Sequence, residues 1–343
     1  MTRCLPVGKV PLDLLSELLE TLPADDPSVV IGPAIGHDAA VVRLGDHLLV
    51  LKTDPITFVT EELGWYAVNV NANDIACLGG TPRWFLASVL LPEGRTTPEL
   101  VRQIVNGLHS ACAALGISLV GGHTEITTGL DHPIVAGTMV GTVEPDRLIQ
   151  PAQARPGDAL LLARGIAIEG TSILARQCAE QLSQRFDAFF LERCRAFLYQ
   201  PGISVVQAAQ LLRQRLGDRL RALHDPTEGG LATGLHELAV ATNLGINVDL
   251  QSIPVYEETR ALCDALAIDP LGLIASGALL AVIAPDAADE GVDVLHSAGI
   301  GAAIIGRLEA DPSLMELRTP AGTVPLPHFQ VDELARLFAE GRC

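Results

Sequence analysis

Residues 69–80 read NVNANDIACLGG. We predict that they close a helix that begins near Glu62, is capped by Thr60 and stops at Gly79-Gly80. Its last turns carry three Asn and one Asp on an otherwise apolar helix, and such side chains are costly to bury without partners. A metal ion or a nucleotide would satisfy them. An exposed polar stripe or a buried hydrogen-bond network would do so as well.

Two further aspartates precede this helix at the edges of apolar segments. Asp38 stands in Gly36-His37-Asp38-Ala39-Ala40, and Asp54 follows a strand-like run from Leu48 to Leu51. Oxygen ligands for a hard cation are held at such places. Together with Asp74, these residues suggest a site for Mg²⁺ and a phosphate-bearing ligand.

Five short motifs follow one another in an order that is typical of one family. They are Gly36-His37-Asp38-Ala39-Ala40-Val41, Thr53-Asp54-Pro55, Asn73-Asp74 with Gly79, Gly121-Gly122-His123-Thr124, and Asp225-Pro226-Thr227-Glu228-Gly229-Gly230-Leu231-Ala232. In this order they resemble the aminoimidazole ribonucleotide synthetase (PurM-like) superfamily, which includes HypE, selenophosphate synthetase and thiamine-monophosphate kinase. The resemblance covers nearly the whole chain and is strongest to HypE-related proteins.

The resemblance implies a two-domain α/β PurM-like fold with mixed sheets flanked by helices. Residues 1–150 would form an AIR synthase-like domain that binds ATP and Mg²⁺, and residues 151–343 would form a second AIR synthase-like domain. It also implies a homodimer, a possible maturation partner protein, and attack of a substrate oxygen on the γ-phosphate of ATP.

Composition limits the other possibilities. The 343 residues carry a net charge of −18, which argues against nucleic acid or an anionic membrane as a partner. Without a membrane-length apolar run or a signal-peptide pattern, we expect a cytoplasmic location. The seven cysteines are scattered and form no Cys-x-x-Cys, so we expect neither a disulfide framework nor a zinc site.

Local patterns predict alternating strands and helices. Strands are expected at 48–51, 85–91, 134–142, 159–163, 246–250, 279–284 and 302–305. Helices are expected at 10–22, 62–80, 97–115, 171–183, 188–199, 204–216, 231–242 and 332–339.

Four aspartates match the family's magnesium ligands: Asp38, Asp54, Asp74 and Asp225. Each of them alone could instead belong to a turn or a helix cap, but four convergent carboxylates would repel one another without a cation. His37 departs from the family, because relatives often have a second Asp there. His123 departs likewise from the acidic residue of HypE, although selenophosphate synthetases have His at that place.

The resemblance also implies a set of nucleotide-binding residues: Lys9, Lys52, Asn73, Gly121, Gly122, His123, Thr124, Gly229 and Gly230. Glycines let a phosphate approach the backbone, and Gly229-Gly230 open a helix whose N-terminus suits an anion. Plain tight turns are the alternative. Lys9 and Glu237 are the candidate catalytic side chains, with Glu237 as a base. Lys9 and Lys52 are the only lysines in the chain.

Cys343 is the last residue, and HypE also ends in a cysteine, which carries the carboxamide that it dehydrates. The Pro-Arg-x-Cys pattern of HypE is absent, since this chain ends Glu340-Gly341-Arg342-Cys343. Three hypotheses therefore stay open. They are a HypE-like dehydratase that uses Cys343, a small-molecule kinase or synthetase like thiamine-monophosphate kinase or selenophosphate synthetase, and a non-catalytic nucleotide-binding assembly factor.

Overall fold

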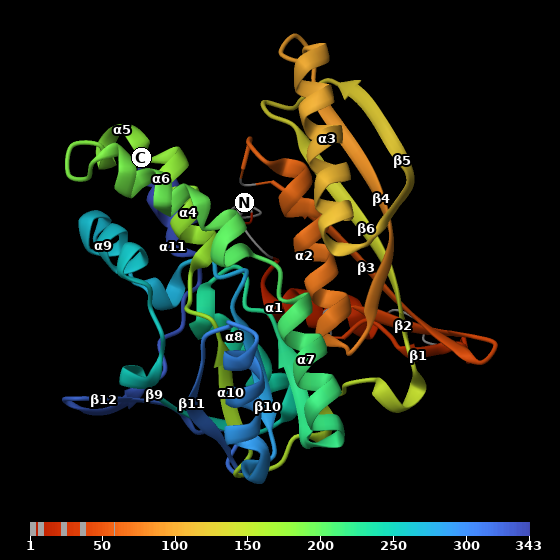
Figure 1. Ribbon diagram of the computed structural model, residues 1–343, viewed down its shortest axis with the longest axis vertical. Coiled ribbons are helices and arrows are strands. Elements are labelled where there is room, and N and C mark those ends of the chain that lie inside the picture. The colour runs from red at the N-terminus through yellow and green to blue at the C-terminus, as the bar shows by residue number, and fades with distance from the viewer. Residues whose placement is uncertain (1–4, 6–9, 22–25, 35–38, 58) are drawn as a thin grey trace.

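The computed structural model describes residues 5, 10–21, 26–34, 39–57 and 59–343. Two mixed sheets organise this part of the chain (Figure 1). The first has the strand order β1-β2-β3-β6-β4-β5. Its strands are β1 (Val29–Ile31), β2 (Ala40–Leu44), β3 (His47–Ile56), β4 (Thr81–Pro92), β5 (Ser118–Thr127) and β6 (Ile134–Val143). Only β4 and β5 pair in parallel; the other neighbours are antiparallel.

Two helices lie lengthwise along one face of the first sheet, α2 (Leu63–Cys77) and α3 (Pro98–Leu115) (Figure 1). They approach each other closely at a glycine. A Cβ atom added to Gly64 would lie 2.3 Å from the backbone nitrogen of Leu108, so no larger residue fits there. The opposite face stays open, and Trp84 on β4 is 41% exposed. Helix α2 is buried almost throughout, because it lies between the sheet, α3 and the second half of the chain.

The second sheet has the strand order β13-β12-β9-β11-β7-β10-β8. Its strands are β7 (Ala159–Ala163), β8 (Leu220–His224), β9 (Gly245–Asp249), β10 (Leu279–Ile283), β11 (Ala302–Glu309), β12 (Met315–Thr319) and β13 (Gly322–Pro325). Strands β7 and β10 are buried at every residue, because helices cover both faces. Alternate residues of β7 belong to two different hydrophobic cores. Leu161 belongs to the core that contains Leu212 and Leu295. Leu160 belongs to the core that contains Leu231 and Leu235.

The remaining helices surround these sheets. They are α1 (Leu12–Glu20), α4 (Ile168–Gln177), α5 (Ala179–Leu182), α6 (Ala188–Ala196), α7 (Val206–Leu216), α8 (Gly230–Thr242), α9 (Glu257–Leu266), α10 (Ala288–Ser297) and α11 (Glu333–Ala339). One core cluster continues from the first half into the second, since α2 packs on α7 and β8. Among the described residues, no helix is long and apolar enough to span a membrane.

The mixed α/β class predicted from the sequence is confirmed, but several elements differ. Strands β1, β2, β5, β8, β12 and β13 and helices α9 and α10 were not expected. The predicted cap of α2 was wrong. Glu62, in the left-handed conformation with φ 56°, precedes the helix without a side-chain cap, and Glu61 instead pairs with Arg176 at 3.1 Å.

Candidate functional site

A lysine and two aspartates meet where β3 and α2 lie side by side. The Nζ atom of Lys52 lies 3.6 Å from Oδ2 of Asp54 and 3.2 Å from Oδ2 of Asp74. Lys52 and Asp54 are two residues apart on β3, so both side chains point to the face that α2 covers. The structure therefore brings three of the predicted site residues together, with an ammonium between two carboxylates.

Asp225 reaches this region from the second half of the chain. It follows β8 directly and is only 2% exposed, and its Oδ1 accepts a hydrogen bond from Sγ of Cys77 at 3.3 Å. Cys77 is the last residue of α2, one turn beyond Asp74. Asp225 of the second half of the chain thus contacts the C-terminal end of α2, the helix that also carries Asp74.

The asparagines of α2 form a buried hydrogen-bond network. Nδ2 of Asn71 donates to the backbone oxygens of Ala67 and, at 3.3 Å, of Asp54, so Asn71 ties α2 to the strand that carries Asp54. Both polar atoms of the Asn73 amide bond the second half of the chain. Nδ2 donates to the backbone oxygen of Ile203, and Oδ1 accepts a hydrogen bond from the backbone nitrogen of Val205. Asn73 was predicted to bind the cofactor. In this structure its amide joins α2 to the segment at Ile203–Val205, and binding of the cofactor stays a prediction.

Replacing Asn73 with Ala should destabilise the protein by about 2–5 kcal/mol, because two buried backbone groups would lose their partner at about 1–3 kcal/mol each. The measurement is urea unfolding followed by circular dichroism. Asn69→Ala is the matched control, since the Asn69 amide donates only within its own helix, to Trp65. It should cost at most about 1 kcal/mol. Equal effects of the two substitutions would contradict the bridging role of Asn73.

A small cavity of about 40 Å³ opens beside Asp54 and contains a carboxylate that the sequence did not single out. Glu169 lines it from the first turn of α4, together with Thr227 and Glu228 of the loop after β8 and Ser276. Burial raises the pKa of Glu169 to about 8, against the lowering effect of hydrogen bonds from Ser276, and the charges of Glu228 and Asp332 raise it further. None of the site residues predicted from the sequence lies near Glu169 in the chain.

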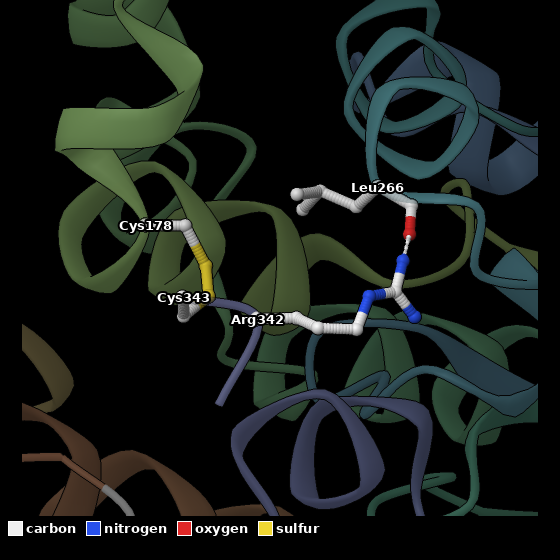
Figure 2. Close-up of a disulfide and its surroundings, with 4 residues drawn as sticks. All are labelled: Cys178, Leu266, Arg342 and Cys343. Atoms are coloured by element: carbon white, nitrogen blue, oxygen red, sulfur yellow. Dashed lines mark hydrogen bonds between the residues drawn. A yellow bond between two sulfur atoms is a disulfide. The ribbon is translucent and has the colours of Figure 1, made fainter. Parts of the chain in front are cut away.

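Cys343 is bonded to Cys178 in a disulfide, so the prediction that the chain forms no disulfide was wrong (Figure 2). Cys178 follows α4 and Cys343 follows α11, and their Cα atoms lie 4.6 Å apart. Arg342 fastens the same segment by donating to the backbone oxygen of Leu266 (Figure 2). The other described cysteines are buried thiols, as expected: Cys77, Cys112, Cys194 and Cys263.

A second, larger cavity of about 340 Å³ lies at Cys343. Thr57, Thr60, His132, Gln177 and Phe338 complete its lining. Thr57 also lines the small cavity with Asp54 and Glu169, so the two cavities share a wall residue. The cavity at Cys343 and the cavity at Asp54 and Glu169 are therefore neighbours at Thr57.

At the start of α8, where Gly229 and Gly230 were predicted to bind the nucleotide, a side chain of the same chain occupies the turn. The backbone nitrogen of Gly229 donates to Oδ2 of Asp332 at 2.6 Å, so the anion at this turn belongs to the chain itself. Burial raises the pKa of Asp332 to about 7, and the hydrogen bonds from Gly229 and Leu334 oppose this shift. A Cβ atom on Gly230 would lie 2.5 Å from the oxygen of Leu271, so close packing requires this glycine.

The motif Gly121–Thr124 lies in the exposed edge strand β5 rather than in a loop. The register places Gly122 three strands away from Asp54, about 14 Å at the usual strand spacing. A Cβ atom on Gly122 would overlap the oxygen of Ala87, so the strand pairing itself requires glycine. His123 and Glu125 contact each other at 3.0 Å on the surface. Within one chain, this motif is separate from the carboxylate cluster.

Glu237 and His224 form a hydrogen-bonded pair at 3.0 Å between α8 and the end of β8. Glu237, predicted as a base, is among the lining residues of neither cavity described above. Lys9, His37 and Asp38 lie outside the described residues. Within the part of the chain that the structure describes, no three His, Cys, Asp or Glu side chains converge as a metal site.

Comparisons with known proteins agree with this architecture. The family model "AIR synthase related protein, N-terminal domain" matches residues 36–143, and the model of the C-terminal domain matches residues 155–315. Carbamoyl dehydratase HypE of Azotobacter vinelandii is 32% identical over 296 residues, which cover 83% of this chain and 83% of that protein. A putative hydrogenase expression/formation protein of Methanocaldococcus jannaschii is 28% identical over 309 residues, 87% of this chain and 88% of its own.

Solved structures of HypE are also similar to this chain. The crystal structure of hydrogenase maturation protein HypE superposes with a TM-score of 0.72 at 26% identity and covers 88% of this chain and 97% of that one. The structure of HypE in complex with ATP superposes with a TM-score of 0.72 at 24% identity, and the match covers 91% of this chain and 92% of that one. The predicted PurM-like resemblance is therefore confirmed: the chain belongs to the AIR synthase related proteins and is similar, over most of its length, to HypE.

Proposed function

We propose that this chain is a Mg-ATP-dependent carbamoyl dehydratase that acts on a carboxamide carried by its own Cys343. The observation that carries the proposal is the position of Cys343. Its cavity shares Thr57 with the small cavity beside Asp54 and Glu169. We propose that a carboxamide on the sulfur passes from the first of these cavities to the second. The curated relatives named carbamoyl dehydratase support the same reaction.

The chemistry begins at the carboxamide oxygen, which attacks the γ-phosphorus of ATP while ADP leaves. Magnesium would neutralise the phosphate charge when bound. Asp54 and Asp74, which both contact Lys52, would hold it, because carboxylate oxygens are the donors that Mg²⁺ prefers. We propose Asp38 and Asp225 as its further ligands. The ammonium of Lys52 between Asp54 and Asp74 indicates that this place suits a cation. Lys52 would neutralise phosphate charge when the nucleotide is bound. Lys9 is proposed for the same role from the sequence alone.

The disulfide sets a condition for this activity. A sulfur bonded to Cys178 cannot carry a carboxamide, so a dithiol must first reduce the bond and leave Cys343 as a thiol. A glycine in the left-handed conformation, Gly341 with φ 62°, precedes the last two residues and allows the tail to turn after reduction.

Partners follow from the same proposal. A crystal structure titled HypE-HypF complex superposes with a TM-score of 0.73 at 24% identity. We propose that this chain also binds a maturation protein, and that this partner supplies the carboxamide. A second copy of this chain would cover the open face and edge of the first sheet, where Trp84, Val120 and Ile126 are 41%, 53% and 60% exposed. Such a homodimer would bring the Gly121–Thr124 motif of one chain towards another chain. We place these events in the cytoplasm.

A second candidate function is supported by the disulfide itself. With Cys343 held away by Cys178, the site could phosphorylate a free small molecule, as a kinase does. The deciding experiment treats reduced protein with cyanate, which carbamoylates thiols, and then measures ADP, AMP and phosphate after Mg-ATP is added. A dehydratase should release ADP and phosphate only from the cyanate-treated protein. Equal ADP release with and without cyanate would contradict the dehydratase and favour the kinase.

Asp74→Asn and Asp54→Asn should each weaken Mg-ATP binding roughly 10–100-fold, because each removes a charge that magnesium and Lys52 both need. The measurement is calorimetric titration with a non-hydrolysable ATP analogue, with and without Mg²⁺. Asp311→Asn is the control, since Asp311 is an exposed loop residue whose side chain accepts hydrogen bonds from Ser313, and this variant should bind the analogue as wild type does. If both cluster variants bound the analogue normally, the assignment of the site would be wrong.

A further inference from the structure

We infer that Glu169 is the catalytic base that removes the N–H protons of the carboxamide; this inference rests on the proposed function. Dehydration of a carboxamide takes both protons from nitrogen, so an acceptor must stand beside it. Glu169 is 5% exposed, lies in the first turn of α4 and lines the small cavity that Asp54 also lines. Glu169 is not one of the proposed magnesium ligands, and the steps described above give it no role.

The Oε2 atom of Glu169 is ready to accept a hydrogen bond. It is buried and has no hydrogen-bond partner among the residues that the structure describes. A buried carboxylate oxygen normally has one, because leaving it without a donor costs about 1–3 kcal/mol or more. The N–H groups of a carboxamide are the donors that would fit this oxygen. Few atoms fit into about 40 Å³, so the cavity suits a carboxamide rather than a nucleotide.

The surroundings of Glu169 favour uptake of a proton. Glu228 and Asp332 face it with negative charge, Asp54 lies across the cavity, and Tyr66 of α2 interacts with it electrostatically. These groups and burial raise its pKa to about 8, which is near the range in which a general base works best at neutral pH. The neighbouring Ser276 opposes the rise of this pKa.

The reaction balances with Glu169 in this role. As the carboxamide oxygen bonds to the γ-phosphorus and the bond to ADP breaks, one N–H proton moves to Glu169. Glu169 then passes it to the phosphate oxygen. The C–O bond breaks next, phosphate leaves with the electron pair, and the second N–H proton follows the same route as the C≡N bond forms. The sum is carboxamide plus ATP giving thiocyanate, ADP and dihydrogen phosphate, with no redox partner.

The test compares Glu169→Gln with wild type, both reduced and treated with cyanate. The thiocyanate on Cys343 should form about 10²–10⁴-fold more slowly in the variant, while the KM for ATP and the binding of an ATP analogue stay within about twofold. Glu333→Gln is the matched control. Glu333 is similarly buried, at 8% exposure, also lies in the first turn of a helix, and pairs with Arg336 away from both cavities. It should keep the wild-type rate.

A second variant guards against a purely structural effect. Glu169→Ala should be as slow as Glu169→Gln, and added formate should restore part of the rate, since a small carboxylate can occupy the vacated space. A Glu169→Gln rate within threefold of wild type, or a Glu169→Ala rate that formate leaves unchanged, would overturn the assignment and leave the dehydratase intact. If wild type itself formed no thiocyanate, the dehydratase and the role of Glu169 would both fall.

Discussion

Cys343→Ala should abolish formation of the thiocyanate, while binding of a Mg-ATP analogue stays within about twofold of wild type. The loss should be complete because the sulfur of Cys343 carries the substrate group itself. The carboxylates that would hold Mg-ATP are contributed by β3, α2 and the loop after β8, and none of these elements contains Cys343. The measurement pairs product detection after cyanate treatment with calorimetry of the analogue.

Cys178→Ala is the matched control, because it removes the other half of the same disulfide. Wild type should be carbamoylated at Cys343 only after dithiothreitol has reduced it. Cys178→Ala should react without a reductant and then form thiocyanate as reduced wild type does. If Cys343→Ala and wild type released ADP equally after cyanate treatment, Cys343 would not be the carrier, and a free metabolite would have to be the substrate.

Glu169→Gln should raise the stability of the metal-free and nucleotide-free protein at alkaline pH. Burial raises the pKa of Glu169 to about 8 in the folded state, whereas an unfolded glutamate titrates near about 4.3. Between these values the folded state holds a proton that the unfolded state has released, so stability falls as pH rises through this window. Above pH 8 the accumulated cost is several kcal/mol, roughly 2–5.

The corresponding measurement is thermal unfolding of both proteins in EDTA from pH 4 to pH 9. Glutamine keeps the shape of the protonated side chain and does not ionise. The variant should therefore melt at the same temperature as wild type near pH 4 and at a progressively higher temperature up to about pH 8 to 9. A difference in melting temperature that does not change with pH would show that the carboxyl of Glu169 is not held in its neutral form by burial. A variant that is more stable yet inactive would be typical of a catalytic group that costs stability.

The fold and the centre of the site could be predicted from the sequence, because short contiguous motifs indicate both. Asp54 and Asp74 come from motifs at the edges of apolar elements, and the structure joins them through Lys52. The polar residues of α2 also had a buried network among their predicted explanations, and Asn71 and Asn73 form one.

The remaining features depend on contacts between distant residues, which no local pattern reveals. Cys178 and Cys343 are 165 residues apart, and the carboxylate that fills the turn at Gly229 is contributed by Asp332. Glu169 could not be recognised from the sequence, because the cavity that it lines is formed together with Ser276 and the loop after β8, which are distant in the chain. The Gly121–Thr124 motif contains glycines that suit a phosphate loop and a close strand pair equally well, and the edge strand β5 uses Gly122 for pairing with β4.

The most direct measurement is the mass of the C-terminal peptide that contains Cys343. Reduced protein is treated with cyanate, freed of excess reagent, incubated with Mg-ATP and digested. The carbamoylated Cys343 peptide should lose the mass of one water in step with the release of ADP, and it should keep its mass when ATP is replaced by the non-hydrolysable analogue. A Cys343 peptide that retains the intact carboxamide while ADP accumulates would contradict the dehydratase.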